Sequence, residues 1–236
     1  MLYAEIAECR ADPRLAERTD VLAMLVRATD EGGRSLSDRE LRDQLMTLLV
    51  AGHETTATTL FWALYLLALD PATQDEVARE VKVLGANGGA LEPERLKFTR
   101  AVIDETLRLY PPAFLIARAA GGPDTIAGMP VKTNDIILVA PWLLHRHEKL
   151  WRDPNAFIPT RFMAPASSPD RFAYLPFGVG ARICIGAHFA LVEATLALAR
   201  LVGAFRVDLA DETPVMPEAV VTTQPDRSPM FVITPR

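Results

Sequence analysis

The ten-residue stretch 177–186, Phe-Gly-Val-Gly-Ala-Arg-Ile-Cys-Ile-Gly, constrains this chain more than any other feature. It places Cys184 directly before an apolar run over 187–204 whose spacing predicts a helix. The positive end of that helix favours a thiolate, and the glycines let a flat ligand approach the main chain. Arg182 can hold an acidic group on the same ligand. Together these residues describe a site for a haem iron with one axial sulfur ligand.

Cys184 taken alone has a plainer interpretation. A free cysteine is most often a small buried hydrophobic residue. The other cysteine, Cys9, is distant and gives neither metal-type spacing nor a disulfide framework, which fits a reducing cytosol. The plain interpretation weakens because every fixed position of a longer pattern is present. The chain here resembles the cytochrome P450 superfamily, whose haem-binding signature is matched by Phe177, Gly180, Arg182, Cys184 and Gly186.

A second motif lies in the middle of a long predicted helix. A capping box over 37–40 starts this helix and Asp70-Pro71 stops it, so it is expected over about 37–69. Its polar centre, 51–56, contains a glycine and hydroxyls that can bond back to carbonyls. We therefore expect a loosened turn with room for a small ligand.

The polar centre of this helix has two chemical interpretations. The order His53-Glu54 begins a zinc-protease motif, but that motif needs a second histidine where the chain has Ala57, so this interpretation fails. The family resemblance implies instead that Glu54 and Thr55 are catalytic, on the oxygen-binding side of the haem. It also implies that Ala51 lines the substrate pocket.

A third motif is the pair Glu105 and Arg108, three residues apart on a helix expected over about 98–110. By itself such a pair indicates a surface ion pair worth a few tenths of a kcal/mol. The resemblance implies instead that both residues join Arg161, from the segment 157–162, in one buried structural network. Removing one member of such a network would leave an unpaired buried charge.

Short elements fill the remainder of the chain. A helix over 71–84 is followed by a glycine loop at 87–89, and an ordered meander is expected over about 148–176. His145 and His147 are interpreted as polar surface, because a zinc site needs three or four ligands, and His188 as a capping or surface residue. Strands are expected at 115–117, 125–126, 130–131, 136–139, 205–209, 220–223 and 231–234.

The segment after the Glu105 helix has a functional interpretation only through the resemblance. On burial statistics alone, Arg118 is an ordinary exposed arginine. The resemblance implies that it is a second partner of the haem propionates, beside Arg182. It implies that the substrate pocket is lined by Ala113, Phe114, Leu115 and Ile116.

Composition excludes several other classes of protein. The net charge is −5 and no dense basic run occurs, which argues against nucleic-acid binding. The apolar stretch 55–69 is too short to cross a bilayer, and the N-terminus lacks the pattern of a signal peptide, so a cytoplasmic protein is expected. No Rossmann or flavin motif occurs. Electrons from NAD(P)H would therefore arrive through a separate ferredoxin or flavoprotein reductase.

These observations predict a mainly α fold with small β-sheets (α+β), as the C-terminal part of a single cytochrome P450 haem domain over 1–236. The resemblance implies a haem-thiolate monooxygenase with haem b that uses dioxygen to oxidise a small hydrophobic organic substrate. Family members are commonly much longer, and their N-terminal half has no counterpart here. Two alternatives follow: a truncated, non-catalytic remnant, and a haem-binding sensor module.

Overall fold

The computed structural model describes residues 1–86, 91–164 and 169–236. The glycine loop predicted at 87–89 and positions 165–168 of the predicted meander lie outside the described residues. The fold is mainly α-helical with small β-sheets, as the sequence predicts. Two compact units divide the chain between Glu54 and Thr55, within one long helix.

Unit 1, residues 1–54, contains α1 (Leu2–Ala11), α2 (Val21–Arg27) and the first part of α3 (Asp38–Leu69). The predicted capping box sets the start of α3: the Glu40 amide donates to Ser37 Oγ over 3.3 Å, and the Ser37 amide donates to Glu40 Oε2 over 2.8 Å. The unit has a small core of its own, formed by Ile6, Cys9, Ala23, Val26 and Leu41.

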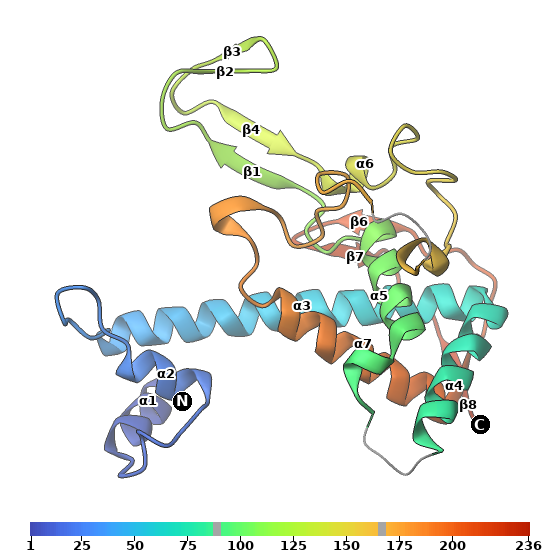
Figure 1. The fold of residues 1–236 in the computed structure, drawn as a ribbon, viewed down its shortest axis with the longest axis horizontal. Coiled ribbons are helices and arrows are strands. Elements are labelled where there is room, and N and C mark those ends of the chain that lie inside the picture. Colours follow the sequence, from blue (N-terminus) through green and yellow to red (C-terminus); the bar gives the residue numbers. More distant parts are fainter. Residues whose placement is uncertain (87–90, 165–168) are drawn as a thin grey trace. The chain divides into compact units, whose positions relative to one another are not determined.

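Unit 2, residues 55–236, is built on four helices: the remainder of α3, α4 (Pro71–Gly85), α5 (Lys97–Leu109) and α7 (Ala187–Ala204). Figure 1 shows α5 and α7 side by side, and α4 packs on both. Their apolar faces form the main core, with Ala63, Leu67, Val77, Val102, Ile103, Leu107, Ala194, Leu198 and Val202. This core fixes α7, and therefore fixes the start of α7 beside Cys184.

The short helical turns η1 (Pro93–Arg95), α6 (Pro141–Leu144), η2 (Pro159–Phe162) and η3 (Gly180–Arg182) connect these elements. In the described residues the strands form antiparallel pairs. They are β1 (Ile116–Ala119) with β4 (Ile136–Val139), β2 (Asp124–Ile126) with β3 (Met129–Val131), β5 (Phe205–Leu209) with β8 (Phe231–Pro235), and β6 (Pro217–Ala219) with β7 (Thr223–Pro225).

The strand predicted at 220–223 is wrong. Residues 220–222 form the reversal between β6 and β7, where the Val220 amide donates to the Thr222 carbonyl over 3.2 Å, and only Thr223 lies in a strand. The β-branched composition of the run suggested a strand, but its two valines do not pack on a sheet. Val220 is 60% and Val221 is 77% exposed.

The loosened turn predicted inside the long helix is also wrong. The helix α3 is α-helical throughout Asp38–Leu69, including the polar centre 51–56. Just after this centre, Thr59 Oγ1 donates back to the Thr55 carbonyl over 2.9 Å, and the helical ladder accommodates this bond.

One helix of the described chain, α7, is long and apolar enough to cross a membrane by length and composition, with a mean hydropathy of 1.4. Core helices of globular proteins pass the same test. Three residues of α7 are buried in the main core of unit 2, as expected for a core helix: Ala194, Leu198 and Val202.

Candidate haem-thiolate site

The segment that carries Cys184 is shaped by backbone hydrogen bonds. The Gly178 amide donates to the Leu175 carbonyl over 3.2 Å, and the Cys184 amide donates to the Phe177 carbonyl over 2.9 Å. Gly178 and Gly180 have φ values of +72° and +79°, a region that favours glycine. The sequence Phe-Gly-Val-Gly therefore bends the chain twice before the cysteine.

Cys184 lies on the surface, which argues against its interpretation as a small buried hydrophobic residue. Its neighbours are also outside the core: Ile183 is 58%, Ile185 is 92% and Phe189 is 71% exposed. Four residues of one short segment thus leave a thiol and three large apolar side chains uncovered. Such a surface fits an apolar ligand with an atom that binds sulfur.

Two arginines lie on the segments that meet near this loop. Arg182 and Arg118 are both exposed, and among the described residues neither forms an ion pair with a carboxylate. Arg118 Nη1 donates to the Ala117 carbonyl over 2.8 Å. The strand of Arg118 comes close to the loop at Ile116, whose Cδ1 lies 3.8 Å from the position of an added Gly178 Cβ. Both guanidinium groups are available for acidic groups of a ligand.

The predicted catalytic pair, Glu54 and Thr55, lies half-buried in α3. Within unit 2, the turn after Thr55 is fixed by polar contacts. Thr59 Oγ1 donates to the Thr55 carbonyl, and the hydroxyls of Thr58 and Thr222 lie 3.5 Å apart. Ala51 is exposed on the same helix, in unit 1.

Glu105, Arg108 and Arg161 come together in one cluster. The side chains of Glu105 and Arg108 are completely buried and share two hydrogen bonds, of 2.7 and 2.9 Å. Arg161 Nε adds a third to Glu105 Oε1 over 3.0 Å, and the Ile158 amide donates to the same oxygen over 2.8 Å. The guanidinium of Arg108 also lies over the ring of Trp151.

The surface interpretation of His145 is wrong, because its side chain is completely buried. Its carbonyl accepts from Arg108, its Nδ1 lies 3.2 Å from the Arg108 carbonyl, and its Nε2 accepts the Leu175 amide over 2.8 Å. Burial lowers its pKa to about 4. No local pattern distinguishes this histidine from His147, which is exposed, so the sequence could not reveal it.

The predicted pocket segment, 113–116, is partly open: Leu115 is 44% exposed and Ile116 is half-buried. Sequence reasoning missed a second apolar feature, Val220 and Val221 at the β6–β7 tip. Three contacts of Thr223 hold this tip next to the start of the pocket segment. Its hydroxyl donates to the Pro111 carbonyl over 2.6 Å, its amide to the Pro112 carbonyl over 3.2 Å, and its carbonyl accepts from Trp62 Nε1 over 2.7 Å.

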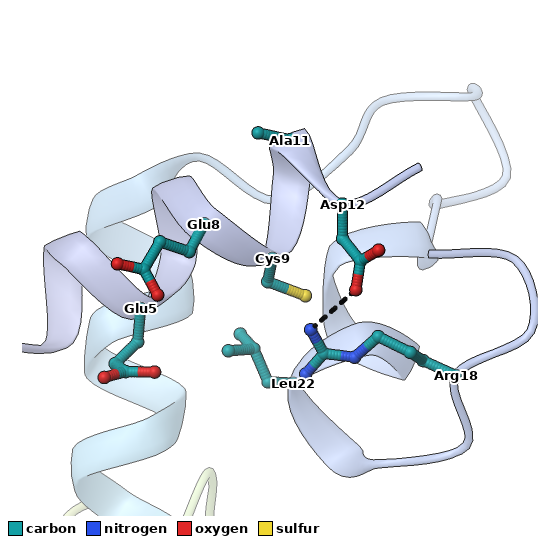
Figure 2. Close-up of a pocket in the computed structure, with 7 residues that line it drawn as sticks. All are labelled: Glu5, Glu8, Cys9, Ala11, Asp12, Arg18 and Leu22. Carbon is teal, nitrogen blue, oxygen red and sulfur yellow. Dashed lines mark hydrogen bonds and ion pairs between the residues drawn. The ribbon is translucent and has the colours of Figure 1, made fainter. Parts of the chain in front are cut away.

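Unit 1 contains a separate hollow, lined by residues of α1, α2 and the loop between them (Figure 2). Its arginine is used internally: Arg18 pairs with Asp12 over 3.3 Å and with Asp20 over 2.7 Å. Cys9 points toward this pair but is 1% exposed and belongs to the core of the unit. We therefore interpret the hollow as a structural feature of unit 1.

Comparisons with known proteins identify the family of the chain. The sequence model of the family described as Cytochrome P450 matches residues 1–230. A Mycobacterium bovis protein with the provisional name cytochrome P450 135B1 is 44% identical over 213 residues, which are 90% of this chain and 43% of that protein. Pentalenene oxygenase of Streptomyces avermitilis is 34% identical over 234 residues, 98% of this chain and 52% of that protein.

A crystal structure of a cytochrome P450, CYP102L1, matches with a TM-score of 0.87 and 30% sequence identity. The match covers 100% of this chain and 55% of the other. This chain belongs to the cytochrome P450 family, which implies a haem cofactor. It spans about half the length of the relatives that it matches.

Proposed function

We propose that this chain forms the thiolate-ligand part of a haem monooxygenase, with Cys184 as the axial ligand of the iron. The observation that carries the proposal is the exposed Cys184 at the start of α7, on a loop that its own backbone shapes and that leaves apolar side chains uncovered. Membership of the cytochrome P450 family supports it, as does a relative named as an oxygenase.

The residues of the loop fit haem b. Cys184 supplies the sulfur, Phe177 and the glycines at 178, 180 and 186 shape the cradle, and Arg182 with Arg118 would neutralise the two propionates. The exposed apolar side chains at 183, 185 and 189 suit a large apolar ring. When bound, the haem supplies dioxygen activation, in which a thiolate ligand favours O–O cleavage.

The protein's own residues would bind substrate and move protons. By resemblance to the family, Thr55 would hold a proton at its hydroxyl on the oxygen side, and Glu54 would pass protons from solvent. By the same resemblance, a small hydrophobic substrate would contact the segment 113–116. The exposed Val220 and Val221 next to that segment extend the apolar surface available to it.

The electrons would come from a partner protein. A ferredoxin or flavoprotein reductase carrying electrons from NAD(P)H would dock on the cysteine side of the haem. The chain then joins one oxygen atom to the substrate and releases the other as water, with two electrons and two protons consumed.

The first test is titration of the purified chain with hemin. We expect one haem per chain and a ferrous carbonyl complex with the red-shifted Soret band of thiolate ligation. Cys184→Ala should lose this band, whereas the matched variant Cys9→Ala should keep it, because Cys9 belongs to the separate core of unit 1. A wild-type chain that stays colourless, or that shows imidazole or water ligation, would overturn the proposal.

The second test addresses proton delivery. With a surrogate ferredoxin and reductase, Thr55→Ala should consume NADPH at a similar rate but release more of the electrons as peroxide. Thr47→Ala, on the same helix with an exposed hydroxyl bonded to the Asp43 carbonyl, is the control. Unchanged coupling in Thr55→Ala would remove this role of the hydroxyl.

A further inference from the structure

A buried histidine lies between the charged network of α5 and the loop that carries Cys184. We propose that His145 is a positioning residue, which transmits the fixed geometry of Arg108 to the cysteine loop through the backbone of Leu175. The proposal depends on the proposed function only for the role given to Cys184. The mechanical coupling itself can be tested without haem.

The contacts of His145 assign its protonation state. A backbone amide only donates, so the 2.8 Å contact from the Leu175 amide requires an unprotonated Nε2. The proton of the neutral ring then lies on Nδ1, which donates to the Arg108 carbonyl over 3.2 Å. The His145 ring thus accepts a hydrogen bond from the loop at Nε2 and donates one to α5 at Nδ1. A neutral imidazole is the histidine form that can do both.

The attachment to α5 is rigid. The His145 carbonyl accepts from Arg108 Nη1 over 2.7 Å, so histidine and arginine are joined by two hydrogen bonds. Arg108 is in turn fixed by Glu105. The His145 amide also closes α6, donating to the Pro141 carbonyl over 2.8 Å. The ring therefore has little freedom to move relative to α5.

Leu175 passes this restraint to the cysteine loop. Its amide is held by His145, and its carbonyl accepts the Gly178 amide over 3.2 Å. Pro176 occupies the second position of the resulting turn, where proline fixes the backbone. The next residue, Phe177, offers the carbonyl that accepts the Cys184 amide over 2.9 Å. The series of contacts runs from Arg108 to the amide of the cysteine.

Tyr174 provides a second anchor one residue earlier. Its hydroxyl donates to the Asp104 carbonyl of α5 over 2.9 Å, and its ring lies 5.3 Å from the ring of His145. The loop is thus tied to α5 by a side chain at 174 and by a main-chain amide at 175. Only the contact through 175 is directly linked to the turn that leads to Cys184, which makes His145 the sharper target.

Two substitutions separate the roles of the ring. In His145→Phe the ring shape remains and both polar atoms are lost. In His145→Gln an amide oxygen can accept from Leu175 in place of Nε2. The matched control is His147→Phe, two residues away and exposed. Hydrogen exchange of the haem-free chain, resolved to single amides, reads the result directly, and maleimide labelling measures access to the Cys184 thiol.

In His145→Phe we expect the amides of Leu175, Gly178 and Cys184 to exchange at least about tenfold faster, while the buried amides of α4 and α7 stay protected. Labelling of Cys184 should accelerate in the same variant, and His145→Gln should restore most of the protection. Wild-type exchange at Leu175 and Cys184 in His145→Phe would overturn the proposal. If His145→Phe fails to fold, a His145→Gln variant without protection at Leu175 and Cys184 would overturn it equally.

Loading the same variants with hemin tests whether the contact of His145 affects ligation of the iron by Cys184. We expect a smaller share of thiolate-ligated ferrous carbonyl complex in His145→Phe, recovered in His145→Gln. Failure of the proposed function would appear in the wild type, as a chain without the thiolate signature, and would leave the exchange results standing. Failure of the coupling would appear as unchanged exchange in a chain that does bind haem through sulfur.

Discussion

Two arginines of this chain illustrate opposite uses of the same side chain. All five N–H groups of Arg108 have acceptors within the protein: both Glu105 oxygens and the carbonyls of His145, Pro154 and Ala156. Arg182, two residues before Cys184, is exposed and has no ion-pair partner among the described residues. The guanidinium of Arg108 stabilises the fold, and that of Arg182 is available to bind a ligand.

The difference extends to the surroundings of each arginine. Arg108 lies at the centre of a cluster that joins α5, α6 and η2, where the side chains of Arg108 and Glu105 are completely buried and Arg161 bonds to the same carboxylate. The cysteine loop is held mainly through its backbone, and the side chains of Ile183, Cys184 and Ile185 are exposed. Substitutions in the first region should therefore change stability strongly, whereas substitutions in the second should change ligand binding.

The largest effect is expected for Glu105→Leu. This change leaves Arg108 buried without its carboxylate and removes the partner of Arg161 as well, which should cost at least about 3–5 kcal/mol. Urea unfolding monitored by circular dichroism measures the loss of stability. If the loss is large enough, the variant will accumulate as insoluble protein instead. Glu92→Leu is the control, because Glu92 and Arg95 form an exposed pair at 4.0 Å, worth about 0–1 kcal/mol.

A Glu105→Leu protein that unfolds within about 1 kcal/mol of the wild type would contradict the comparison. It would mean that the buried carboxylate contributes no more than an exposed one. The network would then be replaceable by packing alone.

The second prediction concerns the pH dependence of stability. Burial lowers the pKa of His145 from 6.5 to about 4, and the positive charges of Arg108 and Arg146 act in the same direction. Above about pH 6.5 the ring is neutral in both states, and its contribution is complete. As the pH falls toward 4, the unfolded chain binds a proton that the folded chain excludes. The free energy of unfolding should then fall by up to about 3 kcal/mol.

Other groups titrate over the same range, so the comparison with His145→Gln isolates this one. The stability difference between wild type and variant should shrink between about pH 7.5 and pH 4.5, because glutamine has no proton to gain. Urea unfolding at both pH values gives the four free energies needed. Parallel losses in the two proteins would mean that His145 is accessible to protons in the folded chain.

The two regions also differ in how far the sequence could predict them. The final helix and the loop before it were expected from local patterns, since an apolar period and glycine spacing act within a few residues. The strand over 136–139 was expected for the same reason and is observed. The predicted strand at 220–223 failed because an apolar run at an exposed tip has the composition of a strand.

The position of His145 could not be predicted because it depends on contacts distant in sequence. Arg108 lies 37 and Leu175 lies 30 residues away. Nothing in the local sequence distinguishes a histidine that accepts an amide in the core from one at the surface. The prediction of a loosened turn at 51–56 failed for a related reason: the surrounding helical turns keep Gly52 helical, although helix propensity alone disfavours glycine there.

A third prediction contrasts two glycines in helices. A Cβ on Gly203 of α7 would lie 2.6 Å from Val81 Cγ1 of α4. Overpacking of this kind costs about 1–3 kcal/mol, and the gain in helix propensity offsets part of it. Gly203→Ala should therefore lower the free energy of unfolding by about 1 kcal/mol. A Cβ on Gly52 meets no described atom within 4 Å, so Gly52→Ala should stabilise by about 0.5–1 kcal/mol. Thermal unfolding of both variants decides the signs.

The contrast becomes sharper with a compensating change. Val81→Ala removes the methyl groups that Gly203→Ala would meet, so the double variant should be more stable than the sum of the single losses indicates. If Gly203→Ala stabilises the protein, as Gly52→Ala should, the contact between α4 and α7 is looser than the structure indicates.

The smallest effect on stability, and the largest on chemistry, is expected for Cys184→Ser. The thiol is exposed and its loop is fixed by the amide of residue 184, which serine retains. The free energy of unfolding of the haem-free chain should therefore change by less than about 0.5 kcal/mol. The thiolate signature with hemin should disappear. A large loss of stability would instead mean that the sulfur contributes to packing. Cys184 would then have a structural role, as Arg108 does.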